Sequence, residues 1–339
     1  MLVAGLLLIG TVAASDGLFE AAGSRLARIP GGGLTLFASL MALVAAVTVV
    51  LNLDTSVVFL TPIVLHAARR RAIDEVAFLY GVVFMSNSAS LLLPGSNLTN
   101  LLVVSHLHVS GSTFAAHMLP AWVAAVLVTL AVVIVWRRDE LRVAGSGEYE
   151  VEPYRFGLGT VGVAAAAGLV LALSNAAIPV LAVGVVLALA QITVSHRMTL
   201  REARDASSAL TLAGLFCFAV ALGTLARLWG GPARLMARAG VWATAGIGAG
   251  ASAAINNLPA AVLLSSRLPA HPAELLVGLD LGPNLVVIGA LSAILWLRVA
   301  RREEAAPSAM TYSKVGVVLV PASMVAALVA LQLFGGGAL

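Results

Sequence analysis

Long apolar stretches follow one another along most of the chain, separated by short polar segments. A helix that crosses the hydrocarbon core of a bilayer needs about 20 predominantly apolar residues. Two stretches, 76–105 and 273–297, are long enough but carry Gly, Pro, Ser, Asn or Asp in their middle, which predicts broken helices. The pattern predicts uninterrupted crossings over residues 1–22, 119–136, 158–173, 178–194, 210–229 and 315–334.

The remaining apolar stretches come in pairs joined by polar residues. Residues 34–51 are followed by 57–68, and residues 241–255 are followed by 258–266. The second segment of each pair is too short to cross a membrane, because a helix rises only about 1.5 Å per residue. We therefore predict two re-entrant hairpins whose tips end inside the protein, where irregular backbone is tolerated if it is buried or lines a wet cavity.

Each half of the chain carries a hairpin followed by a broken helix. This duplication predicts an all-α polytopic membrane protein built from inverted repeats, each with a re-entrant hairpin and a broken transmembrane helix. We expect the first repeat over residues 1–136, a polar cytoplasmic linker over 137–157, and a helix pair with the second repeat over 158–339. The first repeat is expected to lack a counterpart of that helix pair at its N-terminus.

Composition and charge support the membrane assignment. Of 339 residues, 60% are hydrophobic and only 11% are charged, which excludes an ordinary soluble domain. Most arginines fall on one side of the predicted layout, which the positive-inside rule makes cytoplasmic, so no nucleic-acid partner is expected. This orientation predicts a multi-pass protein of the cell inner membrane, with the first hairpin entering from the cytoplasm and the second from outside. The arginines on the opposite side are Arg227, Arg234, Arg238 and Arg267.

Polar residues at the hairpin tips and in the broken helices are the candidate binding residues. At a tip inside the membrane, the second arm offers free N-terminal amides and the first arm offers free carbonyls. Side chains there can bind a solute or only cap the helix ends. The candidate substrate- or ion-binding residues are Asn52, Asp54, Thr55, Ser56, Ser96, Asn97, Thr99, Asn100, Asn256, Asn257, Asp280 and Asn284. Further candidates to line the same cavity are Ser86, Asn87, Ser88 and Ser90.

Asp54 and Asp280 are the most informative candidates, because a carboxylate at membrane depth is costly and usually functional. Either one can bind Na⁺ or exchange a proton, which predicts H⁺ or Na⁺ as the coupling ion. The alternative for Asp280 is a structural pairing with an arginine or an amide. A different class of protein, an intramembrane aspartyl hydrolase, requires the two carboxylates within hydrogen-bonding reach, whereas a transporter places both beside helix ends around a cavity.

No cofactor or resident metal is expected. His106, His108 and His117 lie close in sequence, but no carboxylate or cysteine accompanies them, so interfacial histidines explain them better than a metal site. Cys217 is the single cysteine, which excludes an intramolecular disulfide.

Four motifs in order resemble the ArsB-type arsenite permeases of the ion transporter superfamily. Residues 52–63 resemble the Asn-Asp-Gly hairpin region of that family, and 96–100 resemble its Ser-Asn-Leu-x-Asn. Residues 256–259 are similar to its Asn-Asn-Met-Pro hairpin, and 280–284 resemble its Asp-Leu-Gly-Pro segment. The chain departs from the family at Leu53, which is inserted between the first Asn and Asp, and in the missing first helix pair.

The resemblance implies efflux of arsenite or antimonite, driven by the membrane gradient or by a soluble ATPase subunit. Related branches exchange Na⁺ for H⁺ or import dicarboxylates with Na⁺, so a coupled anion transporter and a Na⁺/H⁺ antiporter are the alternatives. No arginine falls near a predicted tip, nor does Lys314, which favours a neutral or weakly anionic solute over a citrate-like anion. A homodimer is the remaining candidate assembly.

Overall fold

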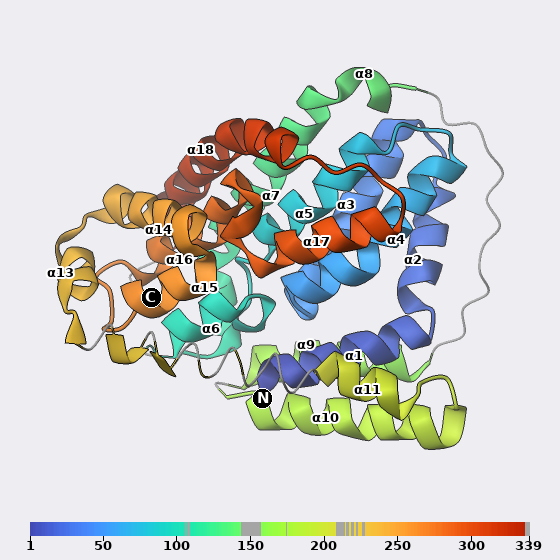
Figure 1. The fold of residues 1–339 in the computed structure, drawn as a ribbon, viewed down its shortest axis with the longest axis horizontal. Helices are drawn as coiled ribbons and strands as arrows, with labels where there is room; N and C mark the ends of the chain where they lie inside the picture. The colour runs from blue at the N-terminus through green and yellow to red at the C-terminus, as the bar shows by residue number, and fades with distance from the viewer. Residues whose placement is uncertain are drawn as a thin grey trace.

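The computed structural model describes residues 1–105, 107, 109–143, 157–173, 175–207, 214, 217, 220–221, 223–225 and 228–335 (Figure 1). Every element of secondary structure in these residues is a helix. Four of the described helices are long and apolar enough to cross a membrane, or five if the bent pair α1 and α2 is one span. The chain is a multi-pass helical protein; the predicted crossing 210–229 and the linker 137–157 lie mostly outside the described residues.

Both halves contain a helix pair, a broken helix and a long helix, in that order. The first half consists of α1 (Leu2–Ser15), α2 (Leu18–Ala27), α3 (Gly33–Val50), α4 (Leu53–Arg70), α5 (Val76–Ala89), the 3-10 turn η1 (Pro94–Ser96), α6 (Leu98–Val104), α7 (Gly111–Trp136) and α8 (Arg138–Leu141). The second half consists of α9 (Leu158–Ala172), α10 (Ala177–Ala190), the π-helix η2 (Gln191–Ser195), α11 (Leu200–Ser207), α13 (Gly231–Arg238), α14 (Val241–Ile255), α15 (Asn257–Leu264), α16 (Pro272–Leu281), the 3-10 turns η3 (Gly282–Leu285) and η4 (Val287–Gly289), α17 (Leu291–Arg302) and α18 (Ala309–Phe334).

The N-terminal segment is bent by 60° between α1 and α2, so the prediction of one uninterrupted crossing over 1–22 is wrong. Gly17 has a positive φ of 74° at the bend, a conformation that glycine adopts without a steric penalty. The carboxylate of Asp16 accepts hydrogen bonds from Gly159 N at 2.6 Å and from Gln191 Nε2 at 2.7 Å. These partners lie far along the chain, and a local apolar pattern therefore gives no sign of the bend.

Both predicted helix pairs are present, but α4 begins at Leu53 and not at residue 57. Asn52 Oδ1 accepts a hydrogen bond from Thr55 N at 2.8 Å, and this N-cap starts the helix early. The polar residues of the first tip therefore belong to the first turn of α4. Because α4 has 18 residues, its length does not distinguish a re-entrant arm from a crossing. The second pair meets at Asn256, as predicted.

Both predicted broken helices are broken where the polar residues occur, α5 from α6 by η1, and α16 from α17 by η3 and η4. The long helices that follow begin earlier than predicted. Ser110 Oγ accepts a hydrogen bond from Thr113 N at 3.1 Å ahead of α7, and Ser308 Oγ accepts one from Thr311 N at 3.3 Å ahead of α18. Polar first turns capped by serine escape a count of apolar residues.

The halves pack against each other in a reciprocal way. The second arm of the first pair, α4, packs against α17, and the second arm of the other pair, α15, packs against α6. The two long helices α7 and α18 also lie side by side, while α1, α9, α10 and α11 gather along one edge of the molecule (Figure 1). This arrangement brings the hairpin tips and the breaks into the middle of the protein.

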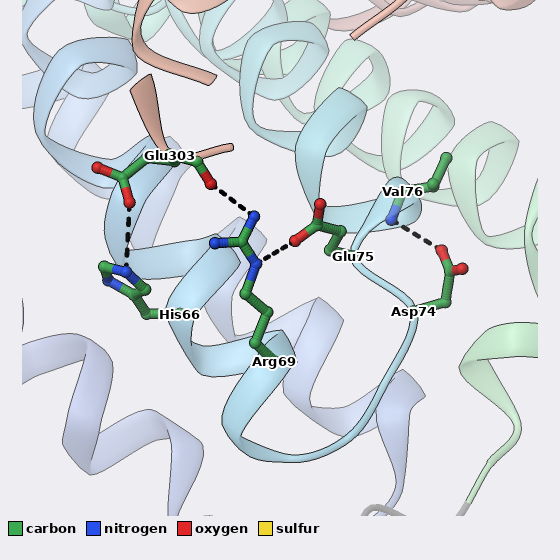
Figure 2. A network of polar contacts seen from close by, with 6 residues as sticks. All are labelled: His66, Arg69, Asp74, Glu75, Val76 and Glu303. Carbon is green, nitrogen blue, oxygen red and sulfur yellow. Dashed lines mark hydrogen bonds and ion pairs between the residues drawn. The ribbon is translucent and has the colours of Figure 1, made fainter. Parts of the chain in front are cut away.

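Polar contacts at the C-terminal end of α4 tie the halves together on the predicted cytoplasmic side. Figure 2 shows Arg69 paired with Glu75 and with the backbone oxygen of Glu303. Arg69 Nη2 donates to that oxygen at 2.7 Å. His66 Nε2 lies 3.2 Å from Glu303 Oε2. Arg69 of α4 is therefore bonded both to the residue that follows α17 and to the residue just before α5.

Candidate solute-binding site

A cavity of about 310 Å³ lies where both helix pairs and both broken helices meet. Among the described residues, four helices start at its wall: α4, α6, α15 and α17. Helix N-termini carry unpaired amides and the positive end of the helix dipole, so the wall presents hydrogen-bond donors. The lining residues are Leu53, Asp54, Asn97, Leu98, Thr99, Ile255, Asn256, Asn257, Leu258, Pro259, Ala290, Leu291 and Ser292.

The structure brings five of the predicted site residues together on this wall and places the others behind it. Asp54, Asn97, Thr99, Asn256 and Asn257 line the cavity. The predicted residues outside the lining are Asn52, Thr55, Ser56, Ser96, Asn100, Asp280 and Asn284, and all of them are buried. The contacts of each side chain decide which of the predicted residues face the cavity.

The first tip combines internal bonds with unpaired polar atoms. Ser56 Oγ accepts a hydrogen bond from Thr48 Oγ1 at 2.8 Å, which joins the two arms α3 and α4. Asn52 caps α4, but its Nδ2 has no partner among the described residues, and neither has the buried Thr55 Oγ1. Asp54, between these two residues, is partly exposed to the cavity. The first tip therefore offers one carboxylate in a polar surrounding.

Two of the predicted residues in the first break hold the irregular backbone. Ser96 Oγ donates to Val49 O at 2.9 Å and fixes the break to α3. Asn100 Nδ2 donates to Ser90 O at 2.8 Å and to Leu93 O at 3.0 Å, and so satisfies two carbonyls left free where α5 ends. These side chains shape the cavity without lining it.

Asp280 is buried beside the cavity and receives hydrogen bonds from the first break. Thr99 Oγ1 donates to Asp280 Oδ1 at 2.6 Å, and Asn97 Nδ2 donates to the same oxygen at 2.9 Å. Ser90 Oγ lies 3.3 Å from Oδ2. Both residues that hold Oδ1 line the cavity, so Asp280 is connected to the cavity wall through Thr99 and Asn97.

The second tip is formed by Asn256, which has a φ of 77°. Positive φ is uncommon outside glycine, although asparagine tolerates it better than most residues. Asn256 Oδ1 accepts a hydrogen bond from Leu258 N at 3.2 Å, and its Nδ2 donates to Ile288 O at 2.9 Å. The side chain therefore caps α15 and ties the tip to the second break.

A polar layer behind the second break includes residues that the sequence did not single out. Asn87 Nδ2 donates to Asn284 Oδ1 at 2.8 Å, and Ser292 Oγ donates to Asn87 Oδ1 at 3.2 Å. Tyr312 OH donates to Pro283 O at 3.1 Å. Of this layer only Ser292 lines the cavity; a lone serine in an apolar stretch gives no local signal. Asn87, expected on the lining, lies behind it, as do Ser86, Ser88 and Ser90.

Charge in the described lining is limited to the carboxylate of Asp54, with no Lys, Arg or His on the wall. The described residues contain no group of three His, Cys, Asp or Glu that could hold a metal ion; His106 and His108 lie outside them. Among the described residues, Asp54 and Asp280 form no hydrogen bond with each other. Asp54 lines the cavity, and Asp280 is bonded to Thr99 and Asn97 of the first break. Asp54 therefore lies on the cavity wall in the first turn of α4, whereas Asp280 lies behind the wall near the end of α16.

Comparisons with known proteins agree with this geometry. The family model described as Citrate transporter, CitMHS, matches residues 1–293. The chain is 26% identical to the Arsenical pump membrane protein of Escherichia coli (strain K12) over 360 aligned positions, gaps included; the match covers 96% of this chain and 84% of that protein. It is 27% identical over 362 residues to the protein of the same name from Yersinia enterocolitica, with the same coverage.

A solved structure is similar over nearly the whole chain. The crystal structure of the Alcanivorax borkumensis YdaH transporter, reported to have an unusual topology, matches with a TM-score of 0.62 at 15% identity. The match covers 98% of this chain and 84% of that chain. At this identity the likeness shows the fold.

Proposed function

The chain belongs to the CitMHS citrate transporter family, and from this premise we propose a substrate, a direction and a coupling ion. Members and relatives are membrane transporters and not enzymes, so the chain is a multi-pass secondary transporter. We propose that it exports arsenite or antimonite across the cell inner membrane, coupled to H⁺ or Na⁺, through an inverted-repeat fold with two re-entrant hairpins. The relatives named arsenical pump membrane protein support this substrate.

The observation that carries the proposal is the chemistry of the cavity wall. Asn257 offers an amide, Asn97 offers an amide oxygen, and Asp54 offers carboxylate acceptors. The hydroxyl oxygens of Thr99 and Ser292 also line the wall and can accept hydrogen bonds, while their protons are donated inside the protein. Fully protonated arsenite is a small neutral triol whose O–H groups donate and whose oxygens accept. Such a solute needs several polar partners and no fixed counter-charge, which matches a wall with one carboxylate and no cation.

A citrate-like anion is the second candidate, favoured by the helix N-termini at the wall and by the family description. It would have to bind close to the carboxylate of Asp54 without a cationic side chain to offset the repulsion. Like charges in a water-poor site repel more strongly than in solution, because the effective dielectric constant is lower. We therefore rank the neutral triol above the polycarboxylate.

Expression in a bacterial strain without its own arsenite efflux tests the substrate. We expect the strain to grow at arsenite concentrations that inhibit the empty-vector strain, and to accumulate several-fold less arsenic. Asp54→Asn should lose most of this protection, because it removes the negative charge and replaces one of the two acceptor oxygens of the carboxylate by an NH₂ donor. Asp139→Asn is a matched control: Asp139 is 92% exposed on α8, far along the chain from the cavity residues.

The same proteins in proteoliposomes decide the alternatives. Arsenite uptake into these proteoliposomes driven by a pH or Na⁺ gradient, with this chain as the sole protein, supports a transporter that works without a soluble ATPase subunit. Absence of protection and of arsenic export from protein verified in the membrane would rule out arsenite. Citrate transport under the same gradients would then establish the anion carrier.

A further inference from the structure

The two broken helices share one five-residue backbone segment, 93–97 in the first and 286–290 in the second, although the second break also contains η3. In the first, Leu93 is extended, with φ −125° and ψ 150°, the three-residue turn η1 follows, and Asn97 is extended again, with φ −146° and ψ 144°. In the second, Val286 is extended, with φ −146° and ψ 144°, the three-residue turn η4 follows, and Ala290 has φ −144° and ψ 153°. Different sequences therefore build one local structure twice.

Polar residues occupy matching positions around these breaks. Thr99 is the second residue of α6, and Ser292 is the second residue of α17. Twelve residues before these hydroxyls stand Asn87 and Asp280, so the spacing is the same in both halves. Each of the four side chains is at most 1% exposed. The correspondence thus covers the whole break without an insertion.

The bonds between these residues cross from one half to the other. Thr99 Oγ1 of the first half donates to Asp280 of the second at 2.6 Å, and Ser292 Oγ of the second donates to Asn87 of the first at 3.2 Å. Such reciprocal contacts are the signature of a two-fold relation between like parts. We call these two hydrogen bonds the crossed pair. Both hydroxyls belong to residues that line the cavity.

The acceptors of the two hydrogen bonds in the crossed pair, Asp280 and Asn87, differ in charge. An ionised carboxylate only accepts hydrogen bonds, whereas an amide also donates. Asp280 accepts from neutral groups of the first break, and Asn87 uses both ends of its amide, accepting from Ser292 and donating to Asn284. Among the described residues, two further titratable groups lie near Asp280: Asp54, which lines the cavity, and Tyr312 of α18, whose OH donates to Pro283 O.

We propose that Asn87 and Asp280 are equivalent positions in the two halves, each accepting one hydrogen bond of the crossed pair, and that the coupling cation acts on the cavity at Asp280, the charged acceptor. A proton or Na⁺ that neutralises Asp280 makes the two bonds chemically alike. The change reaches the cavity through Thr99 and Asn97, which hold the carboxylate and line the wall. Asn87 is a positioning residue that acts through Ser292. This inference rests on the proposed function only in taking the transporter to be cation-coupled.

Moving the carboxylate from one position to the other tests the equivalence. Asp280→Asn mimics the neutral state, because its Oδ1 can still accept from Thr99 while its Nδ2 can donate to Ser90 Oγ. The double variant Asn87→Asp with Asp280→Asn places the charge where Ser292 donates. There Asn284 can turn its amide to donate as well, since the present bond of its Nδ2 to Phe84 O is long, at 3.5 Å.

A cysteine on the cavity wall reports the response without any transported solute. Ile255→Cys, in the chain carrying Cys217→Ser, places a thiol on the lining at a residue that is 48% exposed. Leu268→Cys, between α15 and α16 at a residue 53% exposed, serves as reference. Both are labelled with a charged methanethiosulfonate reagent in purified full-length protein. The ratio of the two rates removes the pH dependence of the thiolate itself.

We expect this ratio to change about threefold or more between pH ~5 and pH ~8, or when Na⁺ replaces K⁺. The change should be absent in Asp280→Asn, present in Asp54→Asn, and restored in the double variant. A double variant that stays flat beside a responsive parent overturns the equivalence. A flat parent, or a response that survives Asp280→Asn, overturns the assignment of the cation to Asp280.

Two hydroxyl variants decide the matter if the double variant does not fold. Thr99→Ala removes the shorter of the two bonds that join Asp280 Oδ1 to the wall and should weaken the response, while Asn97 keeps the other bond. Ser292→Ala removes the hydroxyl that donates to Asn87, the neutral acceptor, and should leave the response in place. A response that is lost in Ser292→Ala and unchanged in Thr99→Ala would overturn the proposal. Since arsenite is absent throughout, failure of the arsenite assignment appears only in the growth and efflux experiment.

Discussion

Asparagine serves two purposes around the cavity because its amide both donates and accepts. Asn97 Oδ1 accepts from Thr99 N at 3.3 Å at the start of α6, while its Nδ2 donates to Asp280. Asn256 likewise caps α15 and donates to Ile288 O. A carboxylate in either place keeps the cap but loses the donor. Exchange of Asn for Asp is therefore not conservative at these tips.

Removal of the cap at Asn52 should destabilise the first tip. Asn52→Ala leaves Thr55 N without its acceptor, and loss of an N-cap typically costs about 1 kcal/mol. We expect a lower Tm of the purified protein in detergent and weaker arsenite protection, because Asp54 is in the same helical turn. Asn175→Ala, which removes an exposed acceptor of Ala177 N, should change neither. An unchanged Tm for Asn52→Ala would refute the capping role.

At the scale of helices, α14 and α16 approach closely because Gly278 has no side chain. A Cβ at Gly278 would lie 2.1 Å from Ala245 O, so the backbone of α14 would have to move. Gly250 on α14 has open space around it and is exposed. The two glycines therefore form a matched test of this contact.

Gly278→Ala should lower the Tm and disturb Asp280, which is two residues further along α16. Overpacking of this kind costs about 1 to 3 kcal/mol. Gly250→Ala should be neutral or stabilising, since alanine exceeds glycine in helix propensity by about 1 kcal/mol. Thermal unfolding of both variants in one detergent provides the measurement. Equal shifts in the two would show that the close approach of α14 and α16 contributes nothing.

The sequence predicts where helices are interrupted better than where they begin or bend. Pro, Gly and clustered Asn and Ser mark both breaks and both tips, because these residues weaken helices locally. The start of α4 depends on the cap by Asn52, and the bend after α1 depends on Asp16 meeting Gly159. A local apolar pattern cannot contain a contact of that range.

The same limit applies to the site. Five predicted residues line the cavity because polar clusters at breaks gather at one place in the fold. The clusters do not tell which atom faces the cavity. Asn97 finds its carboxylate partner 183 residues away, whereas Asn100 turns to the backbone of its own break. Ser292 stands alone among apolar residues and acquires its role only through Asn87.

On the scale of the whole molecule, the reciprocal packing of α4 on α17 and of α15 on α6 indicates a two-fold relation between the two halves. Together with the arginine distribution, it predicts opposite orientations for the two halves. Units related by an axis in the membrane plane enter the bilayer from opposite faces, and a cavity between them can open to either side in turn. The crossed pair supports the same relation at atomic detail. The first helix pair should then start and end in the cytoplasm, and the second outside.

Labelling of single cysteines in whole cells tests this orientation. Ile29→Cys, 40% exposed just before α3, stands for the start of the first pair, and Leu268→Cys, 53% exposed, follows the second. Both are made with Cys217→Ser. A membrane-impermeant maleimide should label Leu268→Cys in intact cells and Ile29→Cys only after permeabilisation. Arginines lie beside Ile29, and most arginines fall on the same side of the membrane as Ile29. Because basic loops are retained in the cytoplasm, this side is expected to be cytoplasmic. Labelling of both sites from the same side would contradict an inverted repeat and leave the matched breaks without a two-fold explanation.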